Sequence, residues 1–163
     1  MVYRTILRKR YLGFSYYTHS DESDKFQHLV EAVNYIRVTQ QEFVMFEFGC
    51  HSGRTFSVMG SAAKFLPLPT DKMYAFDSFE GLPLEENSGI FMPGTFSTSK
   101  KRFKSIVKNK TGIKLSSHQI VEGFYSETLS DRDSLDLPTP SLVHIDVDLY
   151  GSTVDILKFL KKL

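Results

Sequence analysis

The fold of this chain is decided by the stretch Phe43-Val-Met-Phe-Glu-Phe-Gly-Cys-His-Ser-Gly-Arg-Thr55. An apolar run ends in Glu47, and a Gly-x-x-x-Gly turn with Gly49 and Gly53 leads into a helical pattern. A strand, a glycine turn and a helix in this order bring bare backbone and a helix N-terminus against a ligand. Glycine suits such a turn because it lacks Cβ and reaches positive φ at little cost. The carboxylate of Glu47 adds a fixed acceptor for ammonium or hydroxyl groups.

The spacing of the two glycines excludes two common ligand motifs. It differs from Gly-x-Gly-x-x-Gly, so the dinucleotide fingerprint is not met. No Gly-Lys-Ser/Thr follows, so the phosphate loop of ATP-binding proteins is absent from the sequence as well. The turn predicts a ligand site, but the class of ligand can be predicted only from the rest of the sequence.

Composition indicates an ordinary soluble protein. With 163 residues the chain has the length of one domain, which buries about 70% of its unfolded surface. The net charge is +1, and the two short basic clusters at 8–10 and 100–104 are typical of solvated faces, with contact to an anionic substrate as the alternative. This balance predicts no nucleic-acid surface.

The single cysteine, Cys50, excludes an internal disulfide and fits a reducing compartment. No run approaches 18 apolar residues, which predicts no membrane span. Residues 1–10 have the charge of the n-region of a signal peptide, but no apolar core follows them. We therefore expect a cytoplasmic protein.

Apolar runs and helical periodicity alternate along the chain. The runs predict strands at residues 43–48, 72–76, 119–122 and 142–147. Helical spacing predicts helices at residues 24–40, 54–66, 100–111 and from 152 onward. The expected N-caps are Ser23 or Asp24 for the first helix, one of Ser97, Thr98 and Ser99 for the third, and Ser152 for the last. The core face of the basic third helix is expected at Phe103, Ile106 and Val107.

Strands that alternate with helices predict an α/β protein with a Rossmann-like, doubly wound, mostly parallel sheet. We expect an N-terminal arm or loop at residues 1–22 and one domain at residues 23–163. Ligands of such sheets bind beyond the carboxyl ends of the strands, at the switch point of the strand order. Acidic residues stand at those ends: Glu47, Asp77, Glu122 and Asp146. The sequence thus predicts that acids from successive strands line a common crevice.

Four motifs occur in a fixed order: Glu47-Phe-Gly-Cys-His-Ser-Gly-Arg-Thr55, Tyr74-Ala-Phe-Asp-Ser-Phe-Glu-Gly-Leu-Pro83, Gly123-Phe-Tyr-Ser-Glu-Thr-Leu129 and His144-Ile-Asp-Val-Asp-Leu-Tyr-Gly-Ser-Thr153. Together they resemble the macrocin O-methyltransferase family of class I methyltransferases, which depend on S-adenosylmethionine (SAM). The second and fourth strings are far more specific than the glycine turn. The resemblance runs from about residue 43 to the C-terminus.

The resemblance implies a SAM-dependent O-methyltransferase that acts on a hydroxyl of a sugar or other small metabolite. Glu47 and the glycine turn would hold the methionyl part of SAM, Asp77 the ribose diol, and Phe124 would stack on the adenine. The implied cofactor-binding residues are Glu47, Gly49, Cys50, His51, Ser52, Gly53, Thr55, Asp77, Ser78, Gly123 and Phe124. The alternatives without a ligand are that Asp77 caps the segment that follows it and that Phe124 is a core residue.

The resemblance also implies a divalent metal beside the reacting hydroxyl. Asp146 would be the catalytic residue, as one ligand of a Mg²⁺ ion, and Asp148 could be the second ligand or a solvated loop acid. Such an ion would lower the pKa of the acceptor hydroxyl and align it with the methyl group. His144 is expected to be a packed core histidine.

In the family the sheet continues beyond the last helix with a fifth strand whose acids complete the metal site. This sequence ends at Leu163, so we expect a truncated chain or a partner that covers the open edge of the fourth strand. A bare apolar strand edge invites pairing, which predicts a homo-oligomer.

Two other functions stay open from the sequence. The chain could be a truncated or non-catalytic SAM-binding module, which binds the cofactor without turnover. It could also be a nucleotide-sugar or dinucleotide enzyme of related topology, although the glycine spacing disfavours this reading.

Overall fold

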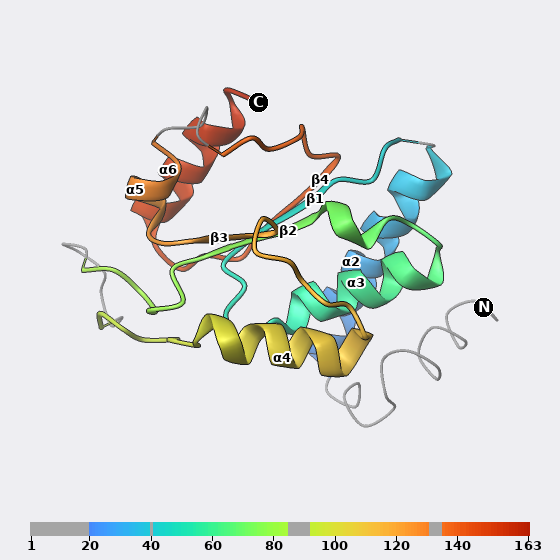
Figure 1. Ribbon diagram of the computed structural model, residues 1–163, viewed down its shortest axis with the longest axis horizontal. Helices are drawn as coiled ribbons and strands as arrows, with labels where there is room; N and C mark the ends of the chain where they lie inside the picture. The colour runs from blue at the N-terminus through green and yellow to red at the C-terminus, as the bar shows by residue number, and fades with distance from the viewer. Residues whose placement is uncertain (1–19, 40, 85–91, 131–134) are drawn as a thin grey trace.

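The computed structural model describes residues 20–39, 41–84, 92–130 and 135–163. Its centre is a four-stranded sheet in the order β3-β2-β1-β4, in which every pair of neighbouring strands is parallel (Figure 1). The strands are β1 (Met45–Phe48), β2 (Met73–Asp77), β3 (Ile120–Glu122) and β4 (Leu142–Ile145). This confirms the predicted α/β class with a parallel sheet.

β1 lies inside the sheet and determines its register. Met45 is aligned with Met73 of β2 on one side and with Leu142 of β4 on the other. All four residues of β1 are buried, as expected for a strand covered on both faces. Because the chain leaves β1 for β2 on one side and places β4 on the other, the strand order switches beside β1. A ligand crevice is expected at the carboxyl end of such a switch.

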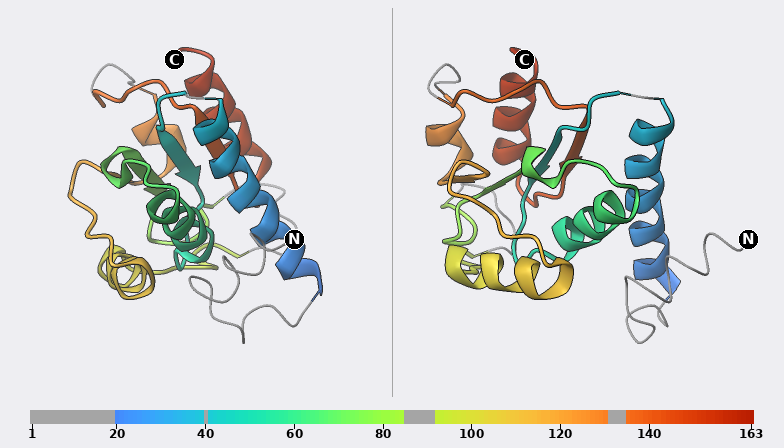
Figure 2. Two further views of the ribbon diagram at one scale, coloured as in Figure 1. Left: turned by 90° about the vertical axis from the view of Figure 1, so that its right-hand side faces the viewer. Right: turned by 45° about the vertical axis from the view of Figure 1, so that its right-hand side comes forward.

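Helices cover both faces of the sheet (Figures 1 and 2). One face carries the helices α2 (Ser20–Val38), α3 (Arg54–Phe65) and α4 (Lys100–Thr111), and the other carries the short helix α5 (Tyr125–Thr128) and α6 (Tyr150–Leu160). Two apolar cores result, one on each side of the sheet. Phe46, Phe48 and Phe76 pack with Phe159 of α6 in the second core, where the Phe48 and Phe76 rings stack at 4.3 Å.

Two predicted helix starts are wrong. α2 begins at Ser20 rather than behind Ser23 or Asp24, so the expected boundary of an arm at residue 22 falls inside the helix. α6 begins at Tyr150 with Leu149 as N-cap, and Ser152 lies in its first turn instead of capping it. The usual signal for a helix start is a polar side chain at the N-cap, so an apolar N-cap such as Leu149 is not recognised from the sequence. Residues 1–19 lie outside the described part of the chain.

Other element predictions are confirmed with small shifts. Ser99 is the N-cap of α4, where its hydroxyl accepts the Arg102 amide at 3.3 Å, and Gly112 ends the helix with φ 75°. Phe103 and Val107 are buried, but Ile106 is half-buried and Thr111 completes the buried face. β1 and β4 are two residues shorter than predicted. The turn η2 (Thr70–Lys72) and helix α5 were not predicted.

Among the described helices, none has the length and apolar character to cross a membrane.

Candidate functional site

The glycine turn after β1 is wedged between the ends of β2 and β4. The Gly49 amide donates to the Phe76 carbonyl at 3.0 Å, and the Asp146 amide donates to the Phe48 carbonyl at 2.9 Å. Gly49 has φ 82°, and a Cβ at this position would lie 2.1 Å from the Asp146 carbonyl oxygen. Backbone atoms cannot move aside as a flexible side chain can. Glycine is therefore required both by conformation and by space.

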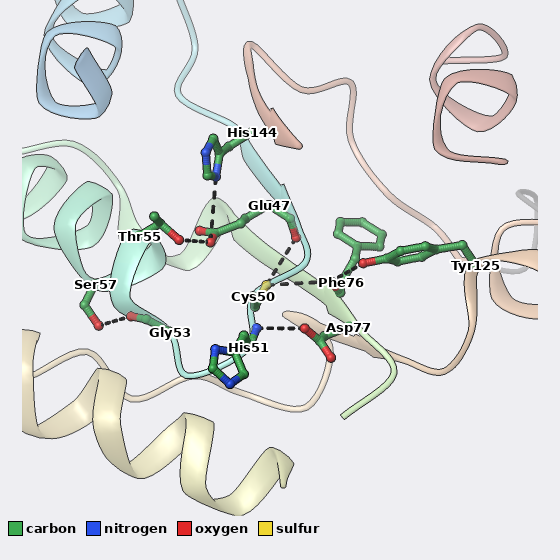
Figure 3. A network of polar contacts seen from close by, with 10 residues as sticks. All are labelled: Glu47, Cys50, His51, Gly53, Thr55, Ser57, Phe76, Asp77, Tyr125 and His144. Carbon is green, nitrogen blue, oxygen red and sulfur yellow. Dashed lines mark hydrogen bonds and ion pairs between the residues drawn. The ribbon is translucent and has the colours of Figure 1, made fainter. Parts of the chain in front are cut away.

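Asp77 holds this turn from the end of β2. Its Oδ2 accepts the His51 amide at 2.8 Å (Figure 3). Its Oδ1 accepts the Phe79 amide at 2.8 Å. His51 itself has φ 43°, a conformation that non-glycine residues adopt rarely. The hydrogen bond from the Phe79 amide agrees with the alternative expectation that Asp77 caps the segment after β2. The bond to His51 adds a second role, because it fixes the turn relative to β2.

Glu47 lies beneath the turn and is fully buried. The Thr55 hydroxyl at the start of α3 donates to its Oε1, and His144 Nδ1 on β4 lies 3.8 Å from the same oxygen (Figure 3). Its Oε2 is buried without a hydrogen-bond partner in the described part of the protein. Burial raises the pKa of the Glu47 carboxyl, against the lowering effects of His144 and Thr55. Glu47 thus joins β1, α3 and β4.

Cys50 and Tyr125 fill the space behind the turn. The Cys50 Sγ contacts the carbonyl oxygens of Glu47 and Phe76 at 3.3 and 3.7 Å. Burial raises the pKa of this thiol well above its ordinary value, which keeps it protonated and unreactive. The Tyr125 hydroxyl donates to the Phe76 carbonyl at 3.0 Å, and burial raises its pKa too. Both side chains are packing groups with satisfied polar atoms.

Two cavities open at the carboxyl ends of the strands. The larger one, of about 400 Å³, has a volume in the range of small-molecule sites. The predicted residues that line it are Gly49, His51, Asp77, Ser78, Gly123, Phe124, Asp146 and Asp148. Segments that follow all four strands thus contribute to one crevice, as the topology predicts.

The smaller cavity, of about 200 Å³, lies on the side of the glycine turn that faces α2 and α3. The predicted residues that line it are Gly49, Cys50, His51, Ser52, Thr55 and Asp146. Gly49, His51 and Asp146 are therefore common to both cavities, and the turn forms the wall between them.

Two predicted site residues line neither cavity. Glu47 lies below the turn, and the space beside Gly53 is occupied, since a Cβ there would meet the Phe103 ring at 2.9 Å. Direct contact of these two residues with a ligand stays a prediction. In this structure Glu47 and Gly53 contribute to the shape of the turn.

The structure adds residues that the sequence did not single out. Phe26 of α2 and Arg54 of α3 line the smaller cavity, and the Arg54 guanidinium lies 5.4 Å from the centre of the Phe26 ring. Phe96 and Asp155 line the larger one. Arg54 stands directly after Gly53 in the motif, so its position was a usable signal. No sequence signal pointed to Phe26, because a helix that is distant in the sequence brings it to the site.

The predicted metal ligands Asp146 and Asp148 both line the larger cavity and are exposed. The described residues nevertheless contain no group of three or more His, Cys, Asp or Glu side chains arranged to hold a metal ion. The donor set in this part of the chain does not by itself fit a metal site.

A family model for the macrocin-O-methyltransferase (TylF) matches residues 21–162. The chain belongs to this family. The four motifs that suggested the resemblance line the larger cavity of this family member: the glycine turn, the Asp77 loop, the Gly123 segment and the Asp146 segment. No curated protein matches the chain.

This family member is also similar in fold to solved methyltransferases. The O-methyltransferase NovP matches with a TM-score of 0.69 and 18% sequence identity, over 86% of this chain and 60% of the NovP chain. The calicheamicin methyltransferase CalS11 matches with a TM-score of 0.67 and 19% identity, over 98% of this chain and 70% of CalS11. An apo structure of CalS11, described as a TDP-rhamnose 3'-O-methyltransferase, matches with a TM-score of 0.55. These likenesses show the class I methyltransferase fold, and this chain spans 60% of the NovP chain.

Proposed function

We propose that this chain is the donor-binding part of a SAM-dependent O-methyltransferase whose acceptor is a hydroxyl of a sugar or another small metabolite. The observation that carries the proposal is the pair of cavities that meet at Gly49, His51 and Asp146. Family membership supports methyl transfer to oxygen, and the cavities supply a separate place for each end of the donor.

The crevice fits the chemistry of SAM. In the larger cavity, Asp77 offers a charged acceptor for the ribose hydroxyls, although each of its oxygens already receives one backbone amide. A carboxylate oxygen can accept a second hydrogen bond, so this is compatible with ribose binding. Gly123 and Phe124 border the same cavity at the end of β3, where the adenine would lie.

The smaller cavity fits a zwitterionic amino acid. Arg54 is a cation that can bind the carboxylate of the methionyl part, and Asp146 is an anion that can bind its ammonium group. The Ser52 hydroxyl lines the same cavity. The methionyl end would then lie on one side of the glycine turn and the nucleoside on the other.

SAM, when bound, supplies an electrophilic methyl group on its sulfonium sulfur. Transfer of this group to oxygen would leave S-adenosylhomocysteine as the thioether product and would release the hydroxyl proton to water in the crevice. The protein's part is to align the two reactants, an effect that can contribute about 7–11 kcal/mol to catalysis. Asp146 lies where both cavities meet and can accept a hydrogen bond from the acceptor hydroxyl. The described carboxylates do not by themselves form a set of metal ligands, so the role proposed here for Asp146 is that of a hydrogen-bond acceptor.

Isothermal titration calorimetry with SAM and with its product S-adenosylhomocysteine tests the proposal. We expect saturable binding of both, and no comparable binding of NAD, the ligand of the alternative dinucleotide enzyme. Methyl transfer to hydroxylated acceptors is then measured with added Mg²⁺ and with EDTA. Binding without transfer under either condition would support a non-catalytic SAM-binding module, and the absence of SAM binding would contradict both.

A further inference from the structure

We propose that helix α4 and the loop before it form a surface that binds the anionic face of a lipid membrane. The association is peripheral: it uses charge and a few exposed apolar side chains, and it needs no helix that spans the bilayer. The inference goes beyond methyl transfer and does not depend on the ligand of the crevice. Three features lead to it: the charge of this segment, the position of the charges on the helix, and the apolar side chains beside them.

Positive charge is concentrated in one segment of the chain. Residues 92–121 contain seven of the 20 lysine and arginine residues and none of the 19 aspartate and glutamate residues. Six of these seven cations belong to α4, which carries no acid. The rest of the chain therefore has more acids than bases, although the net charge of the whole is only +1. The near-neutral total thus results from an uneven distribution of charge, which can attract an anionic partner to one side of the molecule.

Three lysines form a row on the side of α4. Lys101, Lys104 and Lys108 follow one another at spacings of three and four residues, so they lie along one side of the helix. We call these three lysines the basic stripe. Lys101 and Lys108 are exposed and Lys104 is half-buried. No ion pair joins any of the three to another residue in the described part of the chain. Their charges are therefore available to a partner.

The helix itself gives no reason for the cations at its N-terminus. Lys100, Lys101 and Arg102 occupy the first turn, where the positive end of the helix dipole disfavours cations, and this turn contains no acid. Lys100 is paired with Glu122 of β3 at 2.6 Å, but Lys101 and Arg102 have no ion pair with any described residue. A solvated face, as expected from the sequence, accounts for the lysines of the last turn, which suit the dipole. The cations of the first turn indicate a negative partner outside the chain.

Large apolar side chains are exposed on the loop that leads into α4. Met92 is 70% exposed, and Leu84 on the other arm of this loop is 86% exposed. The Leu82 amide donates to the Thr95 carbonyl at 3.0 Å and the Gly94 amide to the Leu82 carbonyl at 2.9 Å, so the two arms are joined. The second arm runs into the N-terminus of α4 (Figure 1). Met92 lines neither described cavity. Exposed apolar groups beside a basic helix are typical of surfaces that insert side chains at a membrane interface.

Two other anionic partners fit this surface less well. Nucleic acids are commonly bound by aromatic side chains that stack on the bases, and the aromatic residue of α4, Phe103, is fully buried. Protein interfaces favour arginine over lysine, whereas five of the six cations of α4 are lysines. Lysine is a compact point charge on a flexible stem, which suits a diffuse layer of lipid headgroups. Binding of a nucleic acid or of an acidic protein is therefore an outcome that the test can reveal.

Flotation of the protein with lipid vesicles tests the inference. Vesicles of phosphatidylcholine alone are compared with vesicles that contain about 30% phosphatidylserine, at about 0.05 M and about 0.3 M NaCl. We expect binding to the phosphatidylserine vesicles at the lower salt concentration, a loss of at least about tenfold at the higher one, and no binding to phosphatidylcholine. A duplex oligonucleotide and polyglutamate serve as soluble polyanions. Both should bind more weakly, per negative charge, than the phosphatidylserine vesicles.

A double variant tests the charges of the basic stripe. Lys101→Gln/Lys108→Gln should weaken binding to the phosphatidylserine vesicles at least about tenfold, and Lys101→Arg/Lys108→Arg should retain the binding because it keeps the charge. The matched control is Lys158→Gln/Lys161→Gln. It removes the same charge from exposed positions at the end of α6, on the opposite face of the sheet, and should change binding less than about twofold.

A single variant tests the apolar part of the surface. Met92→Ser should weaken binding to the phosphatidylserine vesicles at least about threefold, because less apolar area enters the interface. Leu157→Ser is the matched control, since Leu157 is a 53% exposed apolar residue of α6. A loss in Met92→Ser no greater than in Leu157→Ser would contradict the part assigned to the loop.

Four results would overturn the inference: no binding to phosphatidylserine vesicles, equal binding to phosphatidylcholine, tighter binding of either soluble polyanion per charge, or equal losses in the α4 and α6 double variants. Circular dichroism of each variant shows whether a loss comes from unfolding. Because the vesicle experiments contain no SAM, they are decided independently of the proposed donor binding.

Discussion

The carboxylate of Asp77 accepts the backbone amide of His51 at 2.8 Å, so the last residue of β2 holds the turn that follows β1. Two strand ends are thereby fixed against each other at the crevice. The same carboxylate lines the larger cavity, where the ribose of a donor is proposed to lie. One side chain thus organises the turn and faces the ligand.

Replacing Asp77 should weaken donor binding. We expect Asp77→Ala to raise the dissociation constant of S-adenosylhomocysteine at least tenfold, equivalent to about 1.4 kcal/mol. The loss combines the missing acceptor for the ribose with a loosened turn. Calorimetry measures it, and Asp71→Ala serves as control because Asp71 is an exposed acid that lines neither cavity. An unchanged dissociation constant in Asp77→Ala would remove the ribose assignment.

Gly49 offers a test of the close approach between the turn and β4. Gly49→Ala should destabilise the protein by more than the roughly 1–2 kcal/mol expected for a left-handed alanine, since its Cβ would collide with the Asp146 carbonyl. Gly94→Ala is the matched control. Its φ is 79°, and its Cβ would meet nothing closer than 3.9 Å. Urea denaturation compares the two variants, and equal losses would show that the collision is relieved at no cost.

The buried carboxyl of Glu47 should make stability depend on pH. Its pKa is raised above the ordinary value of 4.5, so the folded protein keeps the proton at pH values where the unfolded chain has lost it. The unfolded state then binds fewer protons, and the contribution of Glu47 to the free energy of unfolding falls as pH rises above 4.5. Glu47→Gln should remove this fall. Denaturation of both proteins between pH 4 and neutrality is the measurement, in the window set by the raised pKa.

The hydroxyl that donates to Glu47 can be removed without a change of shape. Thr55→Val should lower the free energy of unfolding by about 1–3 kcal/mol, because it leaves more of a buried carboxyl without a partner. Thr55→Ser retains the donor and should lose less. If the valine and serine variants are equally stable, the hydrogen bond does not support the fold.

Arg54 should recognise the amino-acid part of the donor and not its nucleoside. We expect Arg54→Gln to weaken S-adenosylhomocysteine binding about tenfold, as for the loss of a charged hydrogen bond. Binding of 5′-methylthioadenosine, which lacks the amino-acid part, should be unchanged. Equal losses for both ligands would assign Arg54 to the structure of the turn. Phe26→Leu offers a milder variant, since it removes the ring beside the guanidinium but keeps an apolar side chain.

In the described part of the sheet, β4 is an edge strand: one side pairs with β1, and the other side has no strand beside it. Its four residues are half-buried. An apolar edge of this kind favours pairing with a second copy. We therefore expect this chain to form dimers or larger assemblies at micromolar concentration. Light scattering over a dilution series measures this, and a monomer at every concentration would contradict it.

The alternation of apolar runs and helical periodicity was enough to predict the parallel sheet, because burial on both faces makes such strands continuously apolar. The glycine turn and the ends of the strands could also be predicted from the sequence. Asp77 ends β2, Asp146 directly follows β4, and Glu47 is the last residue but one of β1. Chain direction alone places residues at these positions near one edge of a parallel sheet. The capping of α4 by Ser99 and its end at Gly112 also follow from local chemistry.

The tertiary structure decided which of these acids meet the cavity. Asp77 and Asp146 line it, whereas Glu47 lies beneath the turn because Thr55 and His144, eight and 97 residues away in sequence, draw its carboxylate into the interior. Phe26 reaches the smaller cavity only because α2 packs on α3. Sequence periodicity reports which face of an element is buried, but which side chains from distant elements meet in space depends on packing. For that reason the motif residues were predictable from the sequence, and the division of the crevice into two cavities was not.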